Sequence, residues 1–362
     1  MGNRQAHRHP YPFTAIVGQE EMKLCLLLNV VDPRIGGVMI MGHRGTGKST
    51  AVRALAEVLP KITRLAGDPF NRPPKEVPAA DPLLAMVGIH ERPRKIERIP
   101  VPVVDLPLGA TEDRVCGTID IEAALTRGVK RFQPGLLAQA NRGFLYIDEV
   151  NLLEDHLVDL LLDVAASGWN VVEREGISVR HPARFVLVGS GNPEEGELRP
   201  QLLDRFGLHA RIVTITDLEQ RLEIVRRRRA YDADPAGFCA QWRPQQRALQ
   251  RRILAARKRL PQVTLPENVL QFAAELCMVL RVDGHRGELT LARAACALAA
   301  LEARSQATLE DVCRVAVPAL RHRLRRDPLE TTDAGDKVAQ AMADLLARQQ
   351  RSAPKTPVMT VT

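Results

Sequence analysis

The octet Gly42-His43-Arg44-Gly45-Thr46-Gly47-Lys48-Ser49 decides the fold of the first part of this chain. It fits the phosphate-loop pattern G-x-x-x-x-G-K-[ST] at every fixed position. An apolar stretch of strand type, 38–41, precedes it, and apolar residues recur after it at helical spacing as far as Pro60. We predict that the octet binds a polyphosphate, because its glycines let backbone amides turn inward at a helix N-terminus. Lys48 would contact the β- and γ-phosphates, and Ser49 would bind Mg²⁺.

Length and composition are those of a water-soluble globular protein. The chain has 362 residues, of which 45% are hydrophobic and 26% charged, enough for two domains and a tail. No apolar run approaches the roughly 20 residues that cross a bilayer, and the polar N-terminus lacks a secretory signal. Its six cysteines form no C-x-x-C pair, which favours reduced, packed thiols. We therefore expect a cytoplasmic protein without a membrane span.

The positive net charge of the chain raises the question of nucleic-acid binding. The net charge is +8, and basic residues cluster at 226–229, 250–259 and 321–326. Each cluster is mixed with apolar residues at helical spacing, which is typical of solvated helix faces. Only three tyrosines and two tryptophans are available for base stacking. We predict no nucleic-acid partner.

Two domains of different type follow from the pattern of elements. Residues 14–215 alternate between strands and helices, which predicts an α/β domain with a parallel sheet sandwiched by helices. Residues 216–330 are rich in Ala, Leu and Arg at helical spacing and predict a C-terminal all-helical domain. We expect residues 1–13 to be flexible. Residues 331–362 predict one helix, at 336–349, and a disordered tail.

Within the first domain, three segments have the composition of central strands: 38–41, 144–147 and 185–188. Nine prolines between Pro69 and Pro107 predict a loop-rich insertion at about 69–107. The alternating segment 168–180 predicts a hairpin.

Candidate catalytic residues follow the second and third strands. Asp148 and Glu149 come directly after 144–147, which would place Asp148 beside Mg²⁺ and Glu149 where it can take a proton from water. Asn192 follows the third strand and could hold that water or contact the γ-phosphate, although Asn-Pro is also a simple turn signal. Arg205 ends a short amphipathic helix, from which it can project outward.

This order of motifs resembles the AAA+ ATPases, whose P-loop NTPase domain is followed by a helical lid domain. No N-K-x-D of GTPases and no L-S-G-G-Q of transporter ATPases occurs. Within AAA+, longer strings resemble the ATPase subunit I family of magnesium chelatases from chlorophyll and bacteriochlorophyll biosynthesis. The resemblance covers roughly residues 13 to 330 and is carried by 13–33, 103–125, 132–168, 172–208, 231–235, 284–301 and 322–329.

The resemblance implies a role for each candidate residue. Asp148 would support the metal, Glu149 would be the catalytic base and Asn192 the first sensor. Arg205 resembles the arginine finger that reaches into the site of a neighbouring subunit. Arg286 resembles the lid sensor arginine, with Arg293 as an alternative.

The same resemblance implies a structural role for two further segments. Residues 128–135 resemble a hairpin that interrupts a core helix, and 69–107 resembles the insertion of this subunit. The segment expected to pack on adenine consists of Ile16, Val17 and Gly18.

The function implied is that of a motor subunit, a ligase component of photosynthetic pigment synthesis. ATP and Mg²⁺ would bind between neighbours in a ring of identical chains, expected to be a hexamer, and hydrolysis would drive Mg²⁺ insertion into protoporphyrin IX. The implied partners are the D and H subunits of magnesium chelatase, of which D is AAA+-like and H binds the porphyrin. Aromatic residues make up only 4% of the chain, so porphyrin binding is expected elsewhere. The alternatives are a MoxR-like chaperone for metal insertion, a motor like replicative helicases and a nucleotide-bound scaffold.

Overall fold

A five-stranded parallel sheet forms the centre of the first domain in the computed structural model, which describes residues 9–43, 45–120, 126, 131–174, 177–196, 198–324 and 333–352. The strand order is β11-β1-β10-β7-β4. In register, Val38 lies between Val188 and Leu208, and Phe144 lies between Val186 and Val103. All carboxyl ends therefore share one edge. The strands are β1 (Val38–Met41), β4 (Val103–Leu106), β7 (Phe144–Ile147), β10 (Val186–Gly191) and β11 (Leu208–Arg211).

Helices cover both faces of this sheet, which explains why every residue of β1 and β7 is buried. Val38 and Ile40 share one apolar cluster with α1 (Glu20–Val31) and α2 (Lys48–Val58). Met39 and Met41 point to the other face, in a cluster with α7 (Asp155–Ser167) and α6 (Leu136–Ala140). The predicted parallel sheet between helices is confirmed.

The predicted insertion at 69–107 needs a correction at its end. It contains η3 (Pro74–Glu76), α3 (Pro82–Met86) and β3 (Ile96–Ile99), which pairs with β2 (Ile62–Leu65) outside the main sheet. It also contains β4, which is the edge strand of the main sheet beside β7. Prolines 102 and 107 flank β4, so the sequence there resembles a loop. An edge strand nevertheless tolerates proline at its ends.

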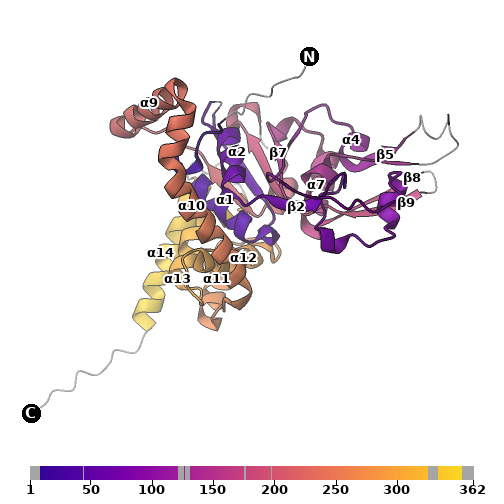
Figure 1. Ribbon diagram of the computed structural model, residues 1–362. Coiled ribbons are helices and arrows are strands. Elements are labelled where there is room, and N and C mark those ends of the chain that lie inside the picture. The colour runs from indigo at the N-terminus through magenta and orange to yellow at the C-terminus, as the bar shows by residue number, and fades with distance from the viewer. Residues whose placement is uncertain are drawn as a thin grey trace, which may run out of the picture.

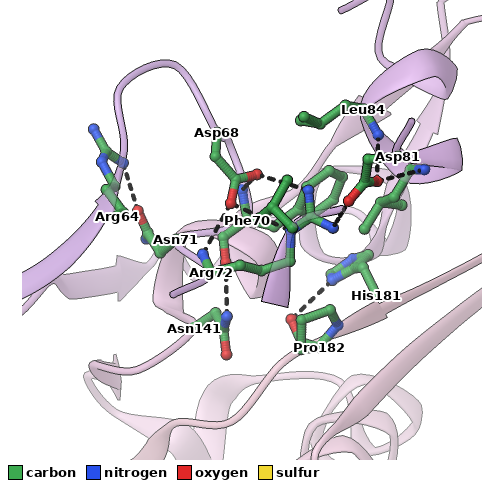
Figure 2. A network of polar contacts seen from close by, with 12 residues as sticks. Arg64, Asp68, Phe70, Asn71, Arg72, Asp81, Leu84, Asn141, His181 and Pro182 are labelled. Atoms are coloured by element: carbon green, nitrogen blue, oxygen red, sulfur yellow. Dashed lines mark hydrogen bonds and ion pairs between the residues drawn. The ribbon is translucent and has the colours of Figure 1, made fainter. Parts of the chain in front are cut away.

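A buried polar network ties this insertion to the body of the domain (Figure 2). The guanidinium of Arg72 lies between Asp68 and Asp81, with 2.7 Å from Nη1 to Asp81 Oδ2. Asp81 also caps α3 by accepting from the amides of Leu83 and Leu84 at 2.8 and 3.0 Å. Asn141, directly after α6, donates from Nδ2 to the carbonyl of Phe70 at 2.7 Å and so joins this cluster of paired charges to the body of the domain.

Two antiparallel hairpins project from the α7 face. β8 (Trp169–Arg174) pairs with β9 (Ile177–Pro182), in agreement with the hairpin predicted at 168–180, whose residues 175–176 lie outside the described residues. β5 (Gly117–Ile119), which follows α4 (Glu112–Cys116), pairs with β6 (Phe132–Pro134). β6 belongs to the hairpin predicted at 128–135, of which residues 128–130 are not described.

The second domain is all helical, as predicted, and packs against α1 through α10 and α12 (Figure 1). α12 contacts α1, α13 contacts β11, and one continuous apolar cluster runs through both domains. The helices are α9 (Leu218–Ala233), α10 (Pro235–Arg259), α11 (Glu267–Val279), α12 (Arg286–Leu301), α13 (Leu309–Leu320) and α14 (Ala334–Ser352). The helix predicted at 336–349 lies within α14, and the predicted disordered tail lies outside the described residues from 353 onward.

The start of the chain differs in part from its predicted flexibility over 1–13. Residues 1–8 are outside the described range, but Tyr11 packs its ring against Tyr231 and Phe238, and Phe13 is buried. Aromatic burial on the helical domain orders this part. Phe13 opens the 3₁₀ turn η1 (Phe13–Ala15). Among the residues described, no helix combines the length and apolar content needed to traverse a bilayer.

Candidate active site

The phosphate loop joins the carboxyl end of β1 to the first turn of α2. Gly45 and Gly47 have φ of 77° and 82°, a left-handed backbone that favours glycine. At Gly42 a Cβ atom would lie 2.7 Å from Cβ of Ile212, so only glycine fits there. The loop therefore reaches the N-terminus of α2, where amides and helix dipole attract anions. Arg44 of the octet is not among the described residues.

Lys48 holds its ammonium group at the edge where β1 and β10 end. Nζ donates to the carbonyl of Gly42, to that of His43 at 3.3 Å and to that of Gly191 at 3.2 Å. Thr46 Oγ1 also donates to the carbonyl of His43, at 2.8 Å. The positive charge thus lies within the loop that would receive phosphates. Ser49 follows in the first turn of α2, as a Mg²⁺ ligand beside a phosphate requires.

Two buried hydroxyls hold the carboxylate of Asp148. Ser190 Oγ donates to Asp148 Oδ1 at 2.5 Å, and the Tyr146 hydroxyl donates to the same oxygen at 3.1 Å. The two hydroxyl oxygens are 3.0 Å apart. Burial raises the pKa of Tyr146, so its hydroxyl remains a neutral donor. Sequence reasoning missed both, because Ser190 and Tyr146 meet only across the β7–β10 pairing.

Glu149 has an unusual backbone at the position assigned to the catalytic base. Its φ of 53° and ψ of 52° are left-handed, which costs a non-glycine residue about 1 kcal/mol or more. Its amide donates to Ser190 Oγ at 3.4 Å. Strain of this kind is common at catalytic positions. Here the strained residue directly follows Asp148, whose carboxylate is held by Ser190.

Asn192 lies buried directly after β10, between the ends of β1 and β7. Its Oδ1 accepts from the amide of Glu194 at 3.3 Å and so caps the turn η5 (Pro193–Glu195). Glu194 in turn approaches the loop, with 3.6 Å from its Oε1 to His43 Nδ1. The structure therefore brings Lys48, Asp148, Glu149 and Asn192 to one edge of the sheet.

Arg205 lies at the opposite edge. It ends α8 (Pro200–Arg205), and Gly207 two residues later donates to the carbonyl of Gly36, just before β1 begins, at 3.2 Å. The Arg205 guanidinium pairs with Asp159 and Asp163 of α7 at 2.9 and 2.8 Å. The amino and carboxyl ends of parallel strands are opposite edges, so Arg205 is placed away from the phosphate loop of its own chain.

Both lid candidates lie at the same edge as Arg205. Arg286 Nη1 donates to Asp204 Oδ2 at 2.8 Å, directly beside Arg205 in sequence. Arg293 instead donates to the backbone carbonyl of Arg34 at 2.6 Å, which anchors α12 to the turn η2 (Pro33–Ile35). Of the two, Arg286 is the one grouped with Arg205.

Asp204 links the helical domain to α8, a role that sequence reasoning missed. Besides Arg286 it faces the buried Arg323, with 3.2 Å from Nε to Oδ1. Arg323 Nη2 donates to the carbonyls of Phe206 and Asp204 at 2.9 and 3.1 Å. Burial lowers the pKa of Arg323 to about 10, and the charge of Asp204 opposes that shift. Arg205 is thus fixed to the helical domain through its neighbour.

The expected adenine segment lies beside α2. The turn η1 packs against α2, and Lys23 Nζ donates to the carbonyl of Ile16 at 3.2 Å. Gly18 has a φ of 63°, and a Cβ there would lie 2.8 Å from Ile215 Cδ1. Val17 lies between them, half-buried. The segment therefore lies between α2 and the connection from β11 to α9, on the side of the sheet that carries the phosphate loop.

The residues fit Mg²⁺ bound together with a nucleotide. Among the described residues, no three His, Cys, Asp or Glu side chains gather as a metal site of their own. Mg²⁺ often takes one or two protein oxygens and completes its shell with phosphate and water. Ser49 and Asp148 would supply the protein oxygens, next to a loop shaped for phosphates.

The fold and this site together define an AAA+ ATPase: phosphate loop, strand-end Asp-Glu pair and asparagine on a parallel sheet, followed by a helical domain. Residues 270–342 match the AAA lid domain, and residues 118–212 match magnesium chelatase, subunit ChlI. The magnesium-chelatase 38 kDa subunit of Chlorobaculum parvum is 64% identical over 344 residues, covering 95% of this chain and 99% of the relative. The chain belongs to the magnesium-chelatase subunit I family.

Other matches agree with this assignment. The magnesium-chelatase subunit ChlI of Synechocystis is 60% identical, covering 92% of this chain and 94% of the relative. A cryo-electron-microscopy structure of the complex between subunits BchI and BchD of magnesium chelatase contains a chain 55% identical to this one, with a TM-score of 0.55. The match covers 91% of this chain and 100% of that one. A putative ATPase from Cytophaga hutchinsonii, 17% identical over 91% of this chain and 90% of its own with a TM-score of 0.61, shares the fold.

Proposed function

We propose that this chain is the ATP-hydrolysing motor subunit of a magnesium chelatase, acting in a ring of identical copies to drive Mg²⁺ insertion into protoporphyrin IX. The observation that carries the proposal is the division of the site between two edges of one sheet. Lys48, Asp148, Glu149 and Asn192 lie at the carboxyl edge, and Arg205 with Arg286 lies at the amino edge. A complete site then needs the arginines of a neighbouring copy.

Each side chain has a physical task in hydrolysis. Lys48 and the loop amides bind the phosphates, and Ser49 and Asp148 would hold Mg²⁺, which would supply positive charge against that of the phosphates. Glu149 accepts the proton of the attacking water, and Asn192 orients that water. A neighbour's Arg205 stabilises charge that develops on the transferred phosphoryl group, for which it leaves Asp159 and Asp163. Arg286 of the same neighbour supports this contact.

The relatives indicate the partners. The BchI chain in the solved complex is bound to BchD, and we propose the corresponding D subunit as a partner here. A porphyrin-binding H subunit would carry the chelation chemistry, with this chain supplying conformational work. We place the complex in the cytoplasm, since all six cysteines are free thiols, as in a reducing compartment. The names of the relatives favour this function over a MoxR-like chaperone, a helicase-like motor or a scaffold.

Reconstitution tests the proposal. The D and H subunits, deuteroporphyrin, Mg²⁺ and ATP are mixed with the wild-type chain, with its Glu149→Gln variant or with no addition, and product is followed by porphyrin fluorescence. We expect Mg²⁺ insertion only with the wild-type chain, because Glu149→Gln binds ATP but cannot take the proton. Insertion at an equal rate without the chain, or with Glu149→Gln, would contradict the proposal.

A further inference from the structure

Helix α9 is the least buried long element of the structure. All 16 of its residues are described, and none is buried. In Figure 1 it lies at the far end of α10, away from the other helices of the second domain. Its inner side is held by Arg227, which stacks on the Trp242 ring at 4.7 Å and donates to the carbonyl of Ala15 at 3.0 Å. Most helical stability in proteins comes from packing of an apolar face, so apolar residues on the outer side of α9 indicate a site for a partner.

That outer face carries an apolar row, here called the α9 stripe: Leu218, Leu222 and Val225. Their spacing places them on one side of the helix, opposite Arg227. Each side chain is between 39% and 66% exposed. Apolar side chains gathered on one exposed face are typical of an interaction surface.

The α9 stripe lies next to the phosphate-loop half of the site. β11 ends at Arg211, at the same edge as Gly42, and the chain then passes Gly18 before α9 begins. A Cβ on Gly18 would lie 2.8 Å from Ile215 Cδ1 and 3.3 Å from Gln220 Oε1 in the first turn of α9. The first turn of α9 therefore lies beside the segment expected to pack on adenine, at the edge of the sheet to which a neighbouring copy would bring its arginines.

A second exposed apolar group, here called the lid patch, flanks Arg286. Met278 and Val279 end α11, and Leu289 lies one turn after Arg286 on α12. The ends of the two helices touch, since a Cβ on Gly287 would lie 3.1 Å from Cys277 Sγ. The three side chains are between 49% and 76% exposed. The lid patch thus borders the other half of the site.

We propose that the α9 stripe of one copy packs against the lid patch of the next copy and closes the seam at which ATP is hydrolysed. The contact cannot form within one chain, because α10 separates the two surfaces by 25 residues of helix, about 38 Å at 1.5 Å per residue. Between copies it joins two different surfaces, which is the kind of interface that generates a ring. The inference rests on the proposed function, and it adds the surface that holds neighbours in register.

Charged substitutions test each surface separately. Val225→Glu in the α9 stripe and Leu289→Glu in the lid patch should each raise the concentration for half-assembly with ATP and Mg²⁺ by about tenfold or more, because a charge buried at an apolar contact opposes association. Light scattering after size-exclusion chromatography measures assembly. Ile96→Glu, at an equally exposed apolar residue of β3, is the matched control and should assemble as the wild type. Binding of a fluorescent ATP analogue should stay within about twofold of the wild type in all three variants, since each surface is exposed.

Mixing the two variants gives the direction of the contact. A pair of Val225→Glu and Leu289→Glu copies keeps one intact seam, formed by α9 of the Leu289→Glu copy and the lid of the Val225→Glu copy. ATPase activity should return in the mixture. Adding Glu149→Gln to the Leu289→Glu copy should abolish it, whereas adding Glu149→Gln to the Val225→Glu copy should not.

The outcomes separate this inference from the proposed function. If the wild type does not assemble with ATP and Mg²⁺, the ring itself is refuted. If the wild type assembles and both variants assemble as readily as Ile96→Glu, or if the Glu149→Gln pattern is reversed, the seam is refuted while the ring stands.

Discussion

At the scale of single residues, the site depends on side chains that position the carboxylates as much as on the carboxylates themselves. Ser190 bonds to Asp148 Oδ1 and also accepts from the amide of Glu149. One hydroxyl therefore holds both the proposed metal carboxylate and the strained backbone of the proposed base. Tyr146 adds a longer bond to the same oxygen.

We predict that Ser190→Ala lowers the rate of ATP hydrolysis about tenfold and raises the Mg²⁺ concentration for half-maximal rate, because Asp148 loses a charge-assisted bond of about 1.5–3 kcal/mol. Affinity for a fluorescent ATP analogue should change less than about threefold, since Lys48 and the loop amides are untouched. Tyr146→Phe, which removes only the longer bond, is the comparison and should have the smaller effect. A Ser190→Ala enzyme with unaltered Mg²⁺ dependence would exclude a positioning role.

The sequence predicts residues of the site when the motif that contains them is local. Lys48 and Ser49 belong to one octet, and Asp148 and Glu149 directly follow one strand, so the spacing along the chain is sufficient to place them at one edge of the sheet. Ser190 is 44 residues from Tyr146, and their contact depends on the register of β7 with β10. No single segment carries that information, so the hydroxyl pair could be found only in the folded chain.

At the scale of elements, runs of apolar residues predict the buried strands correctly. A high proline content leads to a wrong prediction for the edge strand β4. The segments expected at 38–41 and 144–147 are β1 and β7. The prolines around β4 place it within the predicted loop-rich insertion, although three of its four residues, Val103, Val104 and Leu106, are apolar. The polar network of Figure 2 explains how the true insertion keeps a defined position despite those prolines.

We predict that His181 makes the hairpin of β8 and β9 sensitive to pH. It is buried on β9, its ring lies 5.0 Å from that of Phe70, and Nε2 lies 2.9 Å from the Asn170 amide nitrogen. The Asn170 amide also donates to the carbonyl of Cys116, while His181 Nδ1 can donate to the carbonyl of Pro182. Burial is the main reason that the pKa of His181 lies below its ordinary value of 6.5. Folded protein therefore favours the neutral ring.

The direction in which stability changes with pH follows from the linkage between protonation and folding. Because the unfolded state binds the proton more readily, the stability from His181 is complete above about pH 6.5 and is lost as the pH falls toward the lowered pKa. We predict that amide exchange in β8 and β9 accelerates between pH 7 and pH 5 relative to that in β1. A His181→Gln variant should show less acceleration over this range. Equal acceleration in wild type and variant would assign the pH effect to other groups.

At the scale of the whole molecule, the position of the helical domain determines whether its arginines face the phosphate loop of their own chain or that of a neighbouring copy. The sequence singled out Arg286 and Arg293 but not the edge of the sheet to which they belong. That placement follows from contacts between distant segments: α12 on α1, α13 on β11, and Arg323 on the carbonyls around Phe206. Because these contacts bury the apolar faces of both domains in one cluster, the helical domain is held against the sheet domain with Arg286 beside Asp204.

A division of the site between copies predicts complementation between inactive variants. Arg205→Ala should bind ATP yet hydrolyse it about 10³- to 10⁵-fold more slowly, as is typical when an arginine finger is removed, and Glu149→Gln should also be inactive. In an equal mixture, a seam works when the phosphate loop comes from Arg205→Ala and the arginine from Glu149→Gln. Random assembly makes that arrangement about one seam in four, so about a quarter of wild-type ATPase activity should return. The control replaces Glu149→Gln with the double variant Glu149→Gln, Arg205→Ala, which supplies no arginine and should restore nothing. Activity that stays absent at every mixing ratio would contradict a site shared between copies, and activity that returns equally with the double variant would show that the neighbour's Arg205 is not required.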